Sequence, residues 1–548
     1  MSNVNETCPA ELPNWCAQRH WSIFWILIVC SLAMVAGRVL TLGDQLPANA
    51  KPFFSANDRS RWATVRALGD RGTFELDQVL ASDDGRQWDS IDKVRHVGAD
   101  GQLHSYSSKP PLLPVLVTGQ YQVLKWLTGW EIATDTFGVV RILLMLINVI
   151  PWGLYLWFVA RMVNSVPVRD WTRYYVLACA GFGTFLGPFV VTLNNHLPAA
   201  SSVMIALYCV SEMIRKASVS WHYYFAAGLF SAFAVTNELP ALSFFAAVGL
   251  IGLTRSWSKT MMGFLPAAAL VGAAAVGTNW WAHGQLNPAY AQRHDGTPIA
   301  IVAGEFSATL DQGKLPDEIR QQIPVTLKFQ RPTVEIGCWP STPSRLRRWV
   351  VRDQITASQL AIVSADNQNY ELLNWENWYD YPGSYWLSSN DLKKSEVDLG
   401  QASIPLYTFH VLFGHHGIFS LTPIWLFSLA GMLALLGGAK MGGTYQMRWL
   451  GAISLAVSVV VIAFYLTRPT IDRNYGGFAC SLRWLLWLAP LWLMSMLPVV
   501  DWLGGSRWGK VLCFTLLFVS ALSAMYPANN PWVHPWLYEI WDLTGLPR

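Results

Sequence analysis

The sequence contains few charged residues for its length. Asp, Glu, Lys and Arg make up 14% of its 548 residues, whereas a typical soluble domain has about 25%. Hydrophobic residues account for 52%, a share that excludes a disordered chain and an ordinary cytosolic enzyme. The formal net charge is only +4, so we expect no nucleic-acid partner.

The sequence also lacks a cysteine framework. Five of its eight cysteines fall in apolar runs, where a cysteine is typically a small buried side chain. No CxxC or Cys/His spacing indicates a zinc site, and no repeat or low-complexity tract is present. The class that remains is a membrane protein with substantial loops outside the bilayer.

Long apolar runs account for the high hydrophobic content. A spanning helix needs about 20 mostly apolar residues, and eleven segments approach that length and character. We therefore predict an all-α polytopic membrane protein with eleven transmembrane helices. In chain order they are Trp21–Leu42, Phe137–Ala160, Tyr174–Leu193, Leu197–Val210, His222–Val235, Leu239–Thr254, Thr260–Asn279, Gly417–Gly438, Arg448–Thr467, Ala479–Val500 and Val511–Tyr526.

Basic residues predict how these helices are oriented, because Lys and Arg concentrate in short cytoplasmic loops. The segment Lys109–Leu127, which contains three prolines, is a candidate twelfth span. We predict an interfacial helix instead, because this choice leaves Lys or Arg in all five cytoplasmic loops and in neither short outer turn. Those loops are Arg161–Arg173, Arg215–Trp221, Arg255–Lys259, Lys440–Arg448 and Asp501–Lys510.

This orientation divides the chain into membrane modules and outer loops. We expect interfacial helices and candidate functional residues in a first outer loop, 43–136, and mixed α/β structure in a second, 280–403. A bacterial cytoplasmic membrane with an outward-facing site is the expected location. The parts are a cytoplasmic tail at 1–20, an N-terminal membrane module at 21–279, the large outer loop at 280–403, a C-terminal membrane module at 404–526 and an outer tail at 527–548.

The first outer loop opens with a helical pattern. Trp62, Val65 and Leu68 recur at helical spacing, while Arg59 and Arg66 fall away from them. This pattern predicts an amphipathic helix that lies on the membrane surface.

Asp58 stands at the start of this helix, where a carboxylate can also serve simply as a helix cap. The same loop ends in Lys109-Pro110-Pro111. The double proline fixes the backbone and places Lys109 near the membrane surface. A lysine at that depth can bind a phosphate or merely extend its charge toward the headgroups.

Polar residues between apolar spans give further candidates. Asn195 and His196 lie in one outer turn, and Glu238 lies in the next. Such groups are costly among apolar spans unless they serve a function, although a short turn needs polar residues as well.

The last outer loop contains Arg473 and Tyr475, and Arg483 follows inside a predicted span. An arginine below the membrane surface often binds phosphate, because its planar fork matches phosphate oxygens.

Two aromatic or histidine-rich patterns remain. His415 and His416 are adjacent, whereas metal-binding histidines on a helix favour i,i+4 spacing, so we predict a polar turn and not a zinc site. The segment Tyr370–Ser389 is rich in Trp and Tyr. Such side chains either pack into a core or stack on sugar rings.

Taken in order, these motifs resemble those of the C-type glycosyltransferases. That family comprises polytopic enzymes that use polyprenyl-phosphate-linked sugars, such as protein O-mannosyltransferases and lipid A aminoarabinose transferases. The resemblance does not extend to the large second outer loop. It is carried by Asp58–Ala63 (DRSRWA), Lys109–Leu112 (KPPL), Asn195–Ala199 (NHLPA), Gly414–Pro423 (GHHGIFSLTP) and Tyr475–Pro490 (YGGFACSLRWLLWLAP).

The resemblance implies a GT-C fold and assigns roles to individual residues. Asp58 matches the general base that deprotonates the acceptor, while Arg61 and Lys109 match contacts to the donor's lipid phosphate. The implied reaction inverts the anomeric centre, and its acceptor is a glycan, a lipid or a protein. We assign substrate binding to Arg61, Lys109, Asn195, His196, Glu238, Arg473 and Tyr475.

The cofactor stays open at this point. A divalent metal is one option, with Asp58 and His196 as candidate ligands. However, Arg59, Ser108 and either Asn195 or His196 stand where the family pattern has acidic residues.

Two other functions fit the same sequence. A polytopic transporter or lipid flippase also has many apolar spans, but the paired repeats and matched broken helices typical of transporters are not visible. A catalytically inactive relative that binds glycan or lipid is the other alternative, and the missing carboxylates favour it.

Overall fold

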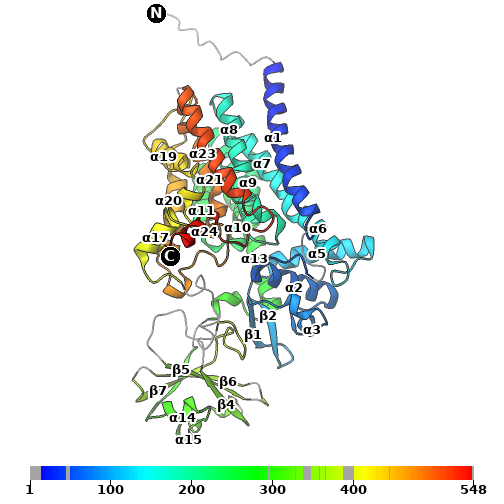
Figure 1. Cartoon of the computed structure of the whole chain (residues 1–548), viewed down its shortest axis with the longest axis vertical. Helices are drawn as coiled ribbons and strands as arrows, with labels where there is room; N and C mark the ends of the chain where they lie inside the picture. Colours follow the sequence, from blue (N-terminus) through cyan, green and yellow to red (C-terminus); the bar gives the residue numbers. More distant parts are fainter. Residues whose placement is uncertain are drawn as a thin grey trace, which may run out of the picture.

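The computed structural model describes residues 14–44, 50–293, 296–327, 329–336, 347–353, 355–356, 358–364, 366–386, 400–442 and 445–545. Within these residues a helical bundle forms most of the molecule, and two smaller parts extend from one of its ends (Figure 1). The first outer part, residues 50–128, contains helices and a hairpin. The second, residues 296–374, contains a β-sheet.

Six helices of the described residues are long and apolar enough to cross a membrane, and a bent pair makes a seventh candidate. The chain is therefore a multi-pass membrane protein. The predicted number of eleven spans is not confirmed, because the other four segments contain helices of only 12 to 17 residues. The candidates are Trp21–Leu40, Thr136–Asn164, His196–Arg215, Trp257–His283, Arg448–Leu466 and Arg507–Met525, with Arg483–Ser495 plus Leu497–Leu503 as the bent pair.

Helix α9 (His196–Arg215) lies at the centre of the bundle and is buried along almost its whole length. Its first turns carry small residues, Ala199 to Ser202, which let neighbouring backbones approach closely. The other bundle helices are α1 (Asn14–Leu40), α6 (Thr136–Leu144), α7 (Ile150–Asn164), α8 (Asp170–Phe182), α10 (Trp221–Asn237), α11 (Leu242–Arg255), α12 (Trp257–Lys259), α13 (Leu265–His283), α17 (Ile404–Leu412), α18 (Ile418–Leu421), α19 (Trp425–Leu436), α20 (Arg448–Leu466), η9 (Arg483–Leu488), α21 (Ala489–Ser495), α22 (Leu497–Leu503), α23 (Arg507–Met525) and α24 (Trp536–Leu543).

The first outer part is built around helix α2 (Ala56–Arg71). It also contains the short helices α3 (Asp77–Leu80) and α4 (Gly85–Trp88) and an antiparallel hairpin of β1 (Lys93–Val97) and β2 (Leu103–Ser107). Helix α5 (Leu112–Thr128) covers the segment that was expected to lie at the interface. It packs against α2 (Ala56–Arg71) and is not among the helices long and apolar enough to cross.

The sequence prediction for α2 is wrong in one respect. Trp62, Val65 and Leu68 are buried in the protein interior, and Ser60 and Arg61 are buried as well. The hairpin, α5 and the turn before α9 enclose the helix on several sides. Helix α2 is therefore an internal helix and does not lie on the membrane surface.

The second outer part is a five-stranded antiparallel sheet in the order β3-β7-β6-β5-β4. The short helices α14 (Ser307–Asp311) and α15 (Asp317–Arg320) pack on it, so this part is mixed α/β, as the sequence predicts. The strands are β3 (Pro298–Ala303), β4 (Pro332–Ile336), β5 (Arg347–Asp353), β6 (Gln359–Ser364) and β7 (Asn369–Asn374).

An aromatic cluster joins the first outer part and the segment that follows the β-sheet to the end of α13. The His96 ring stacks on Tyr106 at 4.0 Å and lies 4.1 Å from the Trp378 ring. His96 Nε2 also lies 3.0 Å from His283 Nδ1. The backbone N–H of Arg95 donates to the Trp378 carbonyl at 2.9 Å. These contacts fix both outer parts at the same end of the bundle.

Candidate active site

A cavity of about 1000 Å³ lies between the first outer part, the bundle and the segments that flank the sheet. Its lining combines charged, aromatic and apolar side chains. Among the described residues, the basic side chains are Arg61, Lys109, Arg293, Arg468 and Arg483, the acidic ones are Asp92, Glu238 and Asp472, and the aromatic ones are Tyr290, Tyr379, Trp386, Phe464, Tyr465 and Trp484.

Helix α2 places Arg61 at the cavity. Its guanidinium donates to the side chain and carbonyl of Asn57, one turn earlier, and to Asn195 Oδ1 at 2.9 Å. Burial, together with the nearby Arg483, lowers the pKa of Arg61 to about 10. Arg61 still carries its charge at neutral pH, so the cavity holds a fixed cation that little water screens.

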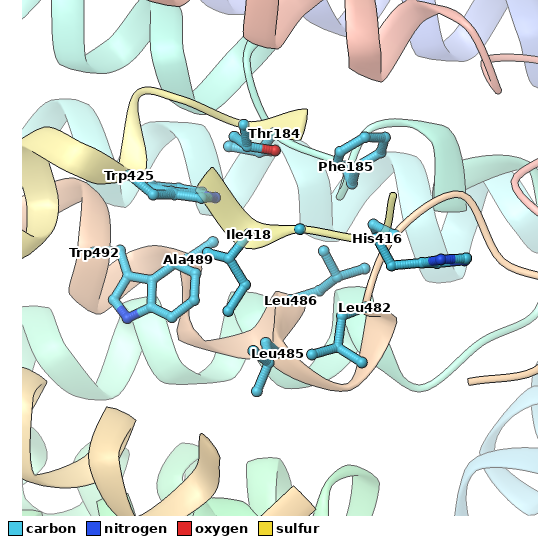
Figure 2. Close-up of a pocket in the computed structure, with 13 residues that line it drawn as sticks. Thr184, Phe185, His416, Ile418, Trp425, Leu482, Leu485, Leu486, Ala489 and Trp492 are labelled. Atoms are coloured by element: carbon cyan, nitrogen blue, oxygen red, sulfur yellow. The ribbon is translucent and has the colours of Figure 1, made fainter. Parts of the chain in front are cut away.

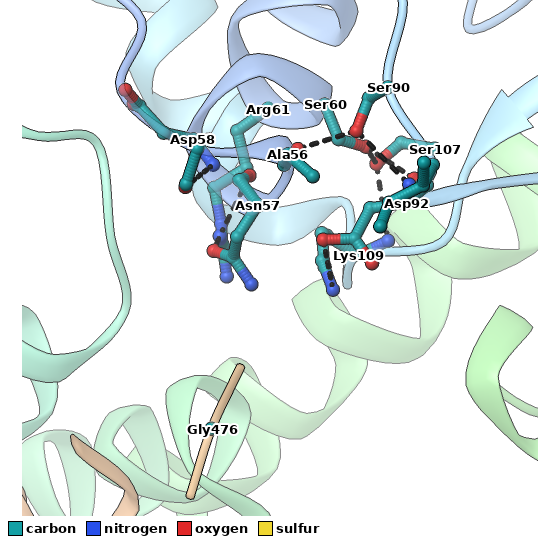
Figure 3. A network of polar contacts seen from close by, with 12 residues as sticks. Ala56, Asn57, Asp58, Ser60, Arg61, Ser90, Asp92, Ser107, Lys109 and Gly476 are labelled. Carbon is teal, nitrogen blue, oxygen red and sulfur yellow. Dashed lines mark hydrogen bonds and ion pairs between the residues drawn. The ribbon is translucent and has the colours of Figure 1, made fainter. Parts of the chain in front are cut away.

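Lys109 and Asp92 form an ion pair at the wall of the cavity, with Nζ and Oδ2 3.0 Å apart. Burial lowers the pKa of Lys109, and the neighbouring Asp92 opposes that shift. Asp92 follows α4 and precedes the hairpin, where its carbonyl accepts a hydrogen bond from Ser60 at 2.7 Å. Figure 3 shows this pair to one side of Arg61 and Asn57.

A chain of polar contacts runs behind the cavity from α9 to η9. The Glu238 carboxyl accepts hydrogen bonds from Asn195 Nδ2 at 2.7 Å and from His196 Nδ1 at 2.6 Å. Arg483 Nη1 donates to His196 Nε2 at 3.1 Å. His196 thus bridges Glu238 and Arg483, and burial raises the pKa of Glu238 to about 8.

Asp58 lies on the far side of Arg61 from the Lys109–Asp92 pair and does not line the cavity (Figure 3). Its Oδ1 accepts from the backbone of Leu193 at 2.9 Å, and its Oδ2 accepts from Phe54 at 3.2 Å. Burial raises the pKa of Asp58 to about 7 against these hydrogen bonds. Asp58 is not the helix cap either, because Ser55 Oγ accepts from the Asp58 backbone N–H.

The structure brings some predicted site residues together and leaves others apart. Arg61, Lys109, Asn195 and Glu238 line the cavity, and His196 contacts Glu238 from behind. Arg473 and Tyr475 do not line it. Arg473 donates to the Ala402 carbonyl and to Thr470, and Tyr475 stacks on His416 at 4.3 Å.

Reasoning from the sequence missed Asp92, Arg293 and Trp386 as cavity residues. Asp92 belongs to no motif, and its position depends on how the hairpin folds back on α2. Trp386 belongs to the segment Tyr370–Ser389, whose high content of Trp and Tyr is visible in the sequence. Nothing in the sequence placed this segment beside the first outer loop.

The cavity borders exposed apolar side chains of two bundle helices. Val460 and Phe464 of α20 are 55% and 44% exposed, and Leu242 of α11 is 54% exposed. All three line the cavity. A ligand with an apolar chain could therefore keep that chain among the membrane helices while its polar end reaches Arg61 and Lys109.

A divalent metal does not fit the two candidate ligands. Both oxygens of Asp58 already accept backbone N–H groups, and both ring nitrogens of His196 face protein partners. In the part of the chain that the structure describes, no three His, Cys, Asp or Glu side chains come together as metal ligands.

His415 and His416 lie in a separate aromatic cluster, with their Nδ1 atoms 2.6 Å apart. His416 also lines a small apolar cavity of about 40 Å³ between α18, α19 and η9 (Figure 2). That volume suits a water molecule or two and not a substrate.

Comparisons with known proteins give a distant structural likeness. No family model matches the chain, and no curated protein matches it. The structure is similar to that of the S. cerevisiae protein O-mannosyltransferase Pmt1-Pmt2 complex bound to the sugar donor. The match covers 98% of this chain and 92% of that chain, with 10% sequence identity and a TM-score of 0.46.

Proposed function

We propose that the protein is a membrane glycosyltransferase that transfers a sugar from a polyprenyl-phosphate donor to an acceptor at the outer membrane face. The observation that carries this proposal is the lining of one cavity by Arg61, Lys109 and Arg483 together with apolar side chains of α20 and α11. A phosphate attached to a long apolar tail has the same two kinds of surface. The motifs that resemble C-type glycosyltransferases contribute the same cations.

In the proposed reaction, an acceptor oxygen attacks the anomeric carbon of the donor sugar. The bond from that carbon to the phosphate oxygen breaks, and the acceptor's proton passes to a carboxylate. Arg61, Lys109 and Arg483 stabilise the negative charge that grows on the departing phosphate. A single displacement of this kind inverts the anomeric centre.

Two carboxylates are candidates for the base. The family resemblance favours Asp58, whereas the cavity favours Asp92, which faces the same space as the cations. When a donor phosphate takes over the contact with Lys109, the Asp92 carboxylate loses its ion-pair partner and becomes available to the acceptor. We therefore propose Asp92 as the base and Asp58 as a residue that positions α2 against the Leu193 turn.

The test is binding and transfer with purified protein and labelled polyprenyl-phosphate sugars. Lys109→Ala and Arg61→Ala should each weaken donor binding by about 1.5–3 kcal/mol, the usual worth of a charged hydrogen bond, which is about 10–150-fold in Kd. Lys125→Ala is the matched control, because Lys125 pairs with Asp70 and Glu131 away from the cavity.

Unchanged donor affinity in both cavity variants would contradict the proposed phosphate site. Normal binding of polyprenyl phosphate with no transfer from any donor sugar would instead favour the inactive, lipid-binding relative.

A further inference from the structure

Three side chains from the ends of the second outer loop form a stack at the cavity wall. The Arg293 guanidinium lies 5.5 Å from the Tyr379 ring centroid and 5.3 Å from that of Trp386. Both distances are within the range of cation–π attraction. Arg293 also lies 3.7 Å from an oxygen of Asp472, so the stack is tied to the last outer loop.

The first outer part holds this stack next to the Lys109–Asp92 pair. Trp386 Nε1 donates to the carbonyl of Ile91, the residue before Asp92, at 3.0 Å. The Tyr379 hydroxyl bonds to Ser108, the residue before Lys109. Both aromatic rings are thus fixed one residue away from the ion pair and line the same cavity.

We propose that Tyr379, Arg293 and Trp386 form a subsite for a pyranose ring. This inference rests on the proposed function and deepens it. One face of a pyranose consists of C–H bonds, which pack well on the electron-rich face of an aromatic ring. The ring hydroxyls can bond to Arg293, Asp472 and Asn474, which line the same wall.

Two sources can supply the ring, namely the donor sugar and a sugar of a glycan acceptor. The stack could contact either ring. During transfer the anomeric carbon lies between the phosphate and the acceptor oxygen, so the donor sugar and the acceptor sugar both lie next to the phosphate site. The two sources share their chemistry and differ in whether the ring is attached to the lipid phosphate.

The test measures binding of three probes to full-length protein in detergent: undecaprenyl phosphate, undecaprenyl-phosphate-linked hexoses and pentoses, and free methyl glycosides in the presence of undecaprenyl phosphate. Trp386→Leu keeps an apolar side chain but removes the aromatic face, and Trp386→Phe restores an aromatic face. Trp375→Leu is the matched control, because Trp375 packs beside Arg352 at 5.9 Å in the same loop and does not line the cavity.

Trp386→Leu should weaken binding of a sugar-bearing probe by about tenfold, the effect of losing an aromatic contact of about 1.4 kcal/mol. Trp386→Phe should retain most of the wild-type affinity, and Trp375→Leu should retain all of it. Loss confined to the lipid-linked sugars assigns the subsite to the donor, and loss confined to the free glycosides assigns it to the acceptor. Binding of bare undecaprenyl phosphate should not change in any of these variants.

Wild-type affinity of Trp386→Leu for every sugar probe would overturn the subsite, and so would a wild-type protein that binds no sugar probe. Failure of the proposed function gives a different result. In that case the wild-type protein would not bind bare undecaprenyl phosphate, whereas the free glycosides would still distinguish Trp386→Leu from the wild type.

Discussion

Asp92 faces the cavity and pairs with Lys109, whereas both oxygens of Asp58 accept backbone N–H groups. We therefore expect the two asparagine variants to differ in turnover and in stability. An amide cannot take up a proton at neutral pH, so Asp92→Asn should lower transfer by at least about 100-fold, the low end of what a positioned base contributes. Its thermal stability should stay close to that of the wild type, because the Asp92 side chain is partly exposed to the cavity. Turnover numbers and melting temperatures of the purified variants check both expectations.

Asp58→Asn is the comparison variant. Asparagine offers one oxygen where two backbone N–H groups are now bound, so we expect a lower melting temperature and a smaller loss of turnover than in Asp92→Asn. A 100-fold loss in Asp58→Asn at normal stability, with near-normal Asp92→Asn, would assign the base to Asp58, as the family resemblance does.

Glu238 predicts a pH dependence of stability. Burial raises its pKa from 4.5 to about 8, so the folded protein holds this proton where the unfolded chain has lost it. The folded state therefore loses stability as the pH rises from about 4.5 to about 8, by up to about 1.4 kcal/mol per pH unit. Glu238→Gln keeps an acceptor oxygen for Asn195 and His196 but has no proton to lose.

We expect Glu238→Gln to melt slightly above the wild-type temperature at pH 5.5 and further above it at pH 8. Melting curves in detergent at both values measure the effect, with the exposed Glu131→Gln as a control for removing a carboxylate. An equal difference in melting temperature between Glu238→Gln and the wild type at both pH values would contradict the raised pKa of Glu238.

Several site residues could be selected from the sequence, although they lie near one another only in the folded protein. Arg61, Lys109, Asn195 and Glu238 come from separate segments. Asn195 and Glu238 were selected as polar groups between apolar spans, whereas Arg61 and Lys109 were selected from the resemblance to C-type glycosyltransferases. Arg473 and Tyr475 were selected from the last outer loop and lie elsewhere, because a polar residue near the membrane surface does not reveal the direction in which its side chain points.

Among the elements, the packing of α2 on α5 decides where Arg61 and Lys109 lie relative to each other. Gly69 of α2 faces Tyr121 of α5, and a Cβ added at Gly69 would lie 2.5 Å from the Tyr121 ring. The ring cannot easily move, because its hydroxyl donates to Asp70 at 2.6 Å and accepts from the Ile132 backbone at 2.9 Å. The two helices touch here only because residue 69 has no side chain.

Gly69→Ala should therefore destabilise the protein by about 1–3 kcal/mol, the usual cost of overpacking, and should weaken donor binding. Gly119→Ala on α5 is the matched control, because nothing lies within 4 Å of a Cβ at that position. Alanine there should be neutral or stabilise by up to about 1 kcal/mol through its helix propensity. Similar melting temperatures for the two variants would contradict this account of the α2–α5 contact.

The helical period predicted that α2 exists, but not that both of its faces are buried. Period 3.6 reports which side chains share a face, but it does not show what packs against the other side of the helix. The hairpin and the Leu193 turn that cover this side are distant in sequence, so their contact with α2 could not be predicted from the pattern.

For the whole molecule, the sequence predicted many spans and two outer loops, but the length of each helix depends on local breaks. The segment Tyr174–Leu193 is apolar throughout, yet α8 ends at Phe182 and a 3-10 turn follows at Pro188–Val191. Hydropathy counts apolar residues whether or not they are helical, so it gives more spans than there are long helices.

The orientation of the bundle is the prediction that concerns the whole molecule. The span Trp257–His283 has 27 residues, about 40 Å of helix, which exceeds the hydrocarbon thickness of about 30 Å. Its His283 end contacts His96 in the first outer part, so Ser258 at its other end should lie on the opposite face of the membrane.

Asp100→Cys and Val325→Cys, both at exposed positions, should therefore react with a membrane-impermeant maleimide from the same side. Ser258→Cys should react only after the membrane is permeabilised. The experiment uses a background without the native cysteines, and that background protein is the control for label that reacts elsewhere. Labelling of residues 100 and 325 from opposite faces, or of residue 258 together with them, would reject the proposed topology, and with it an outer-face site that both loops share.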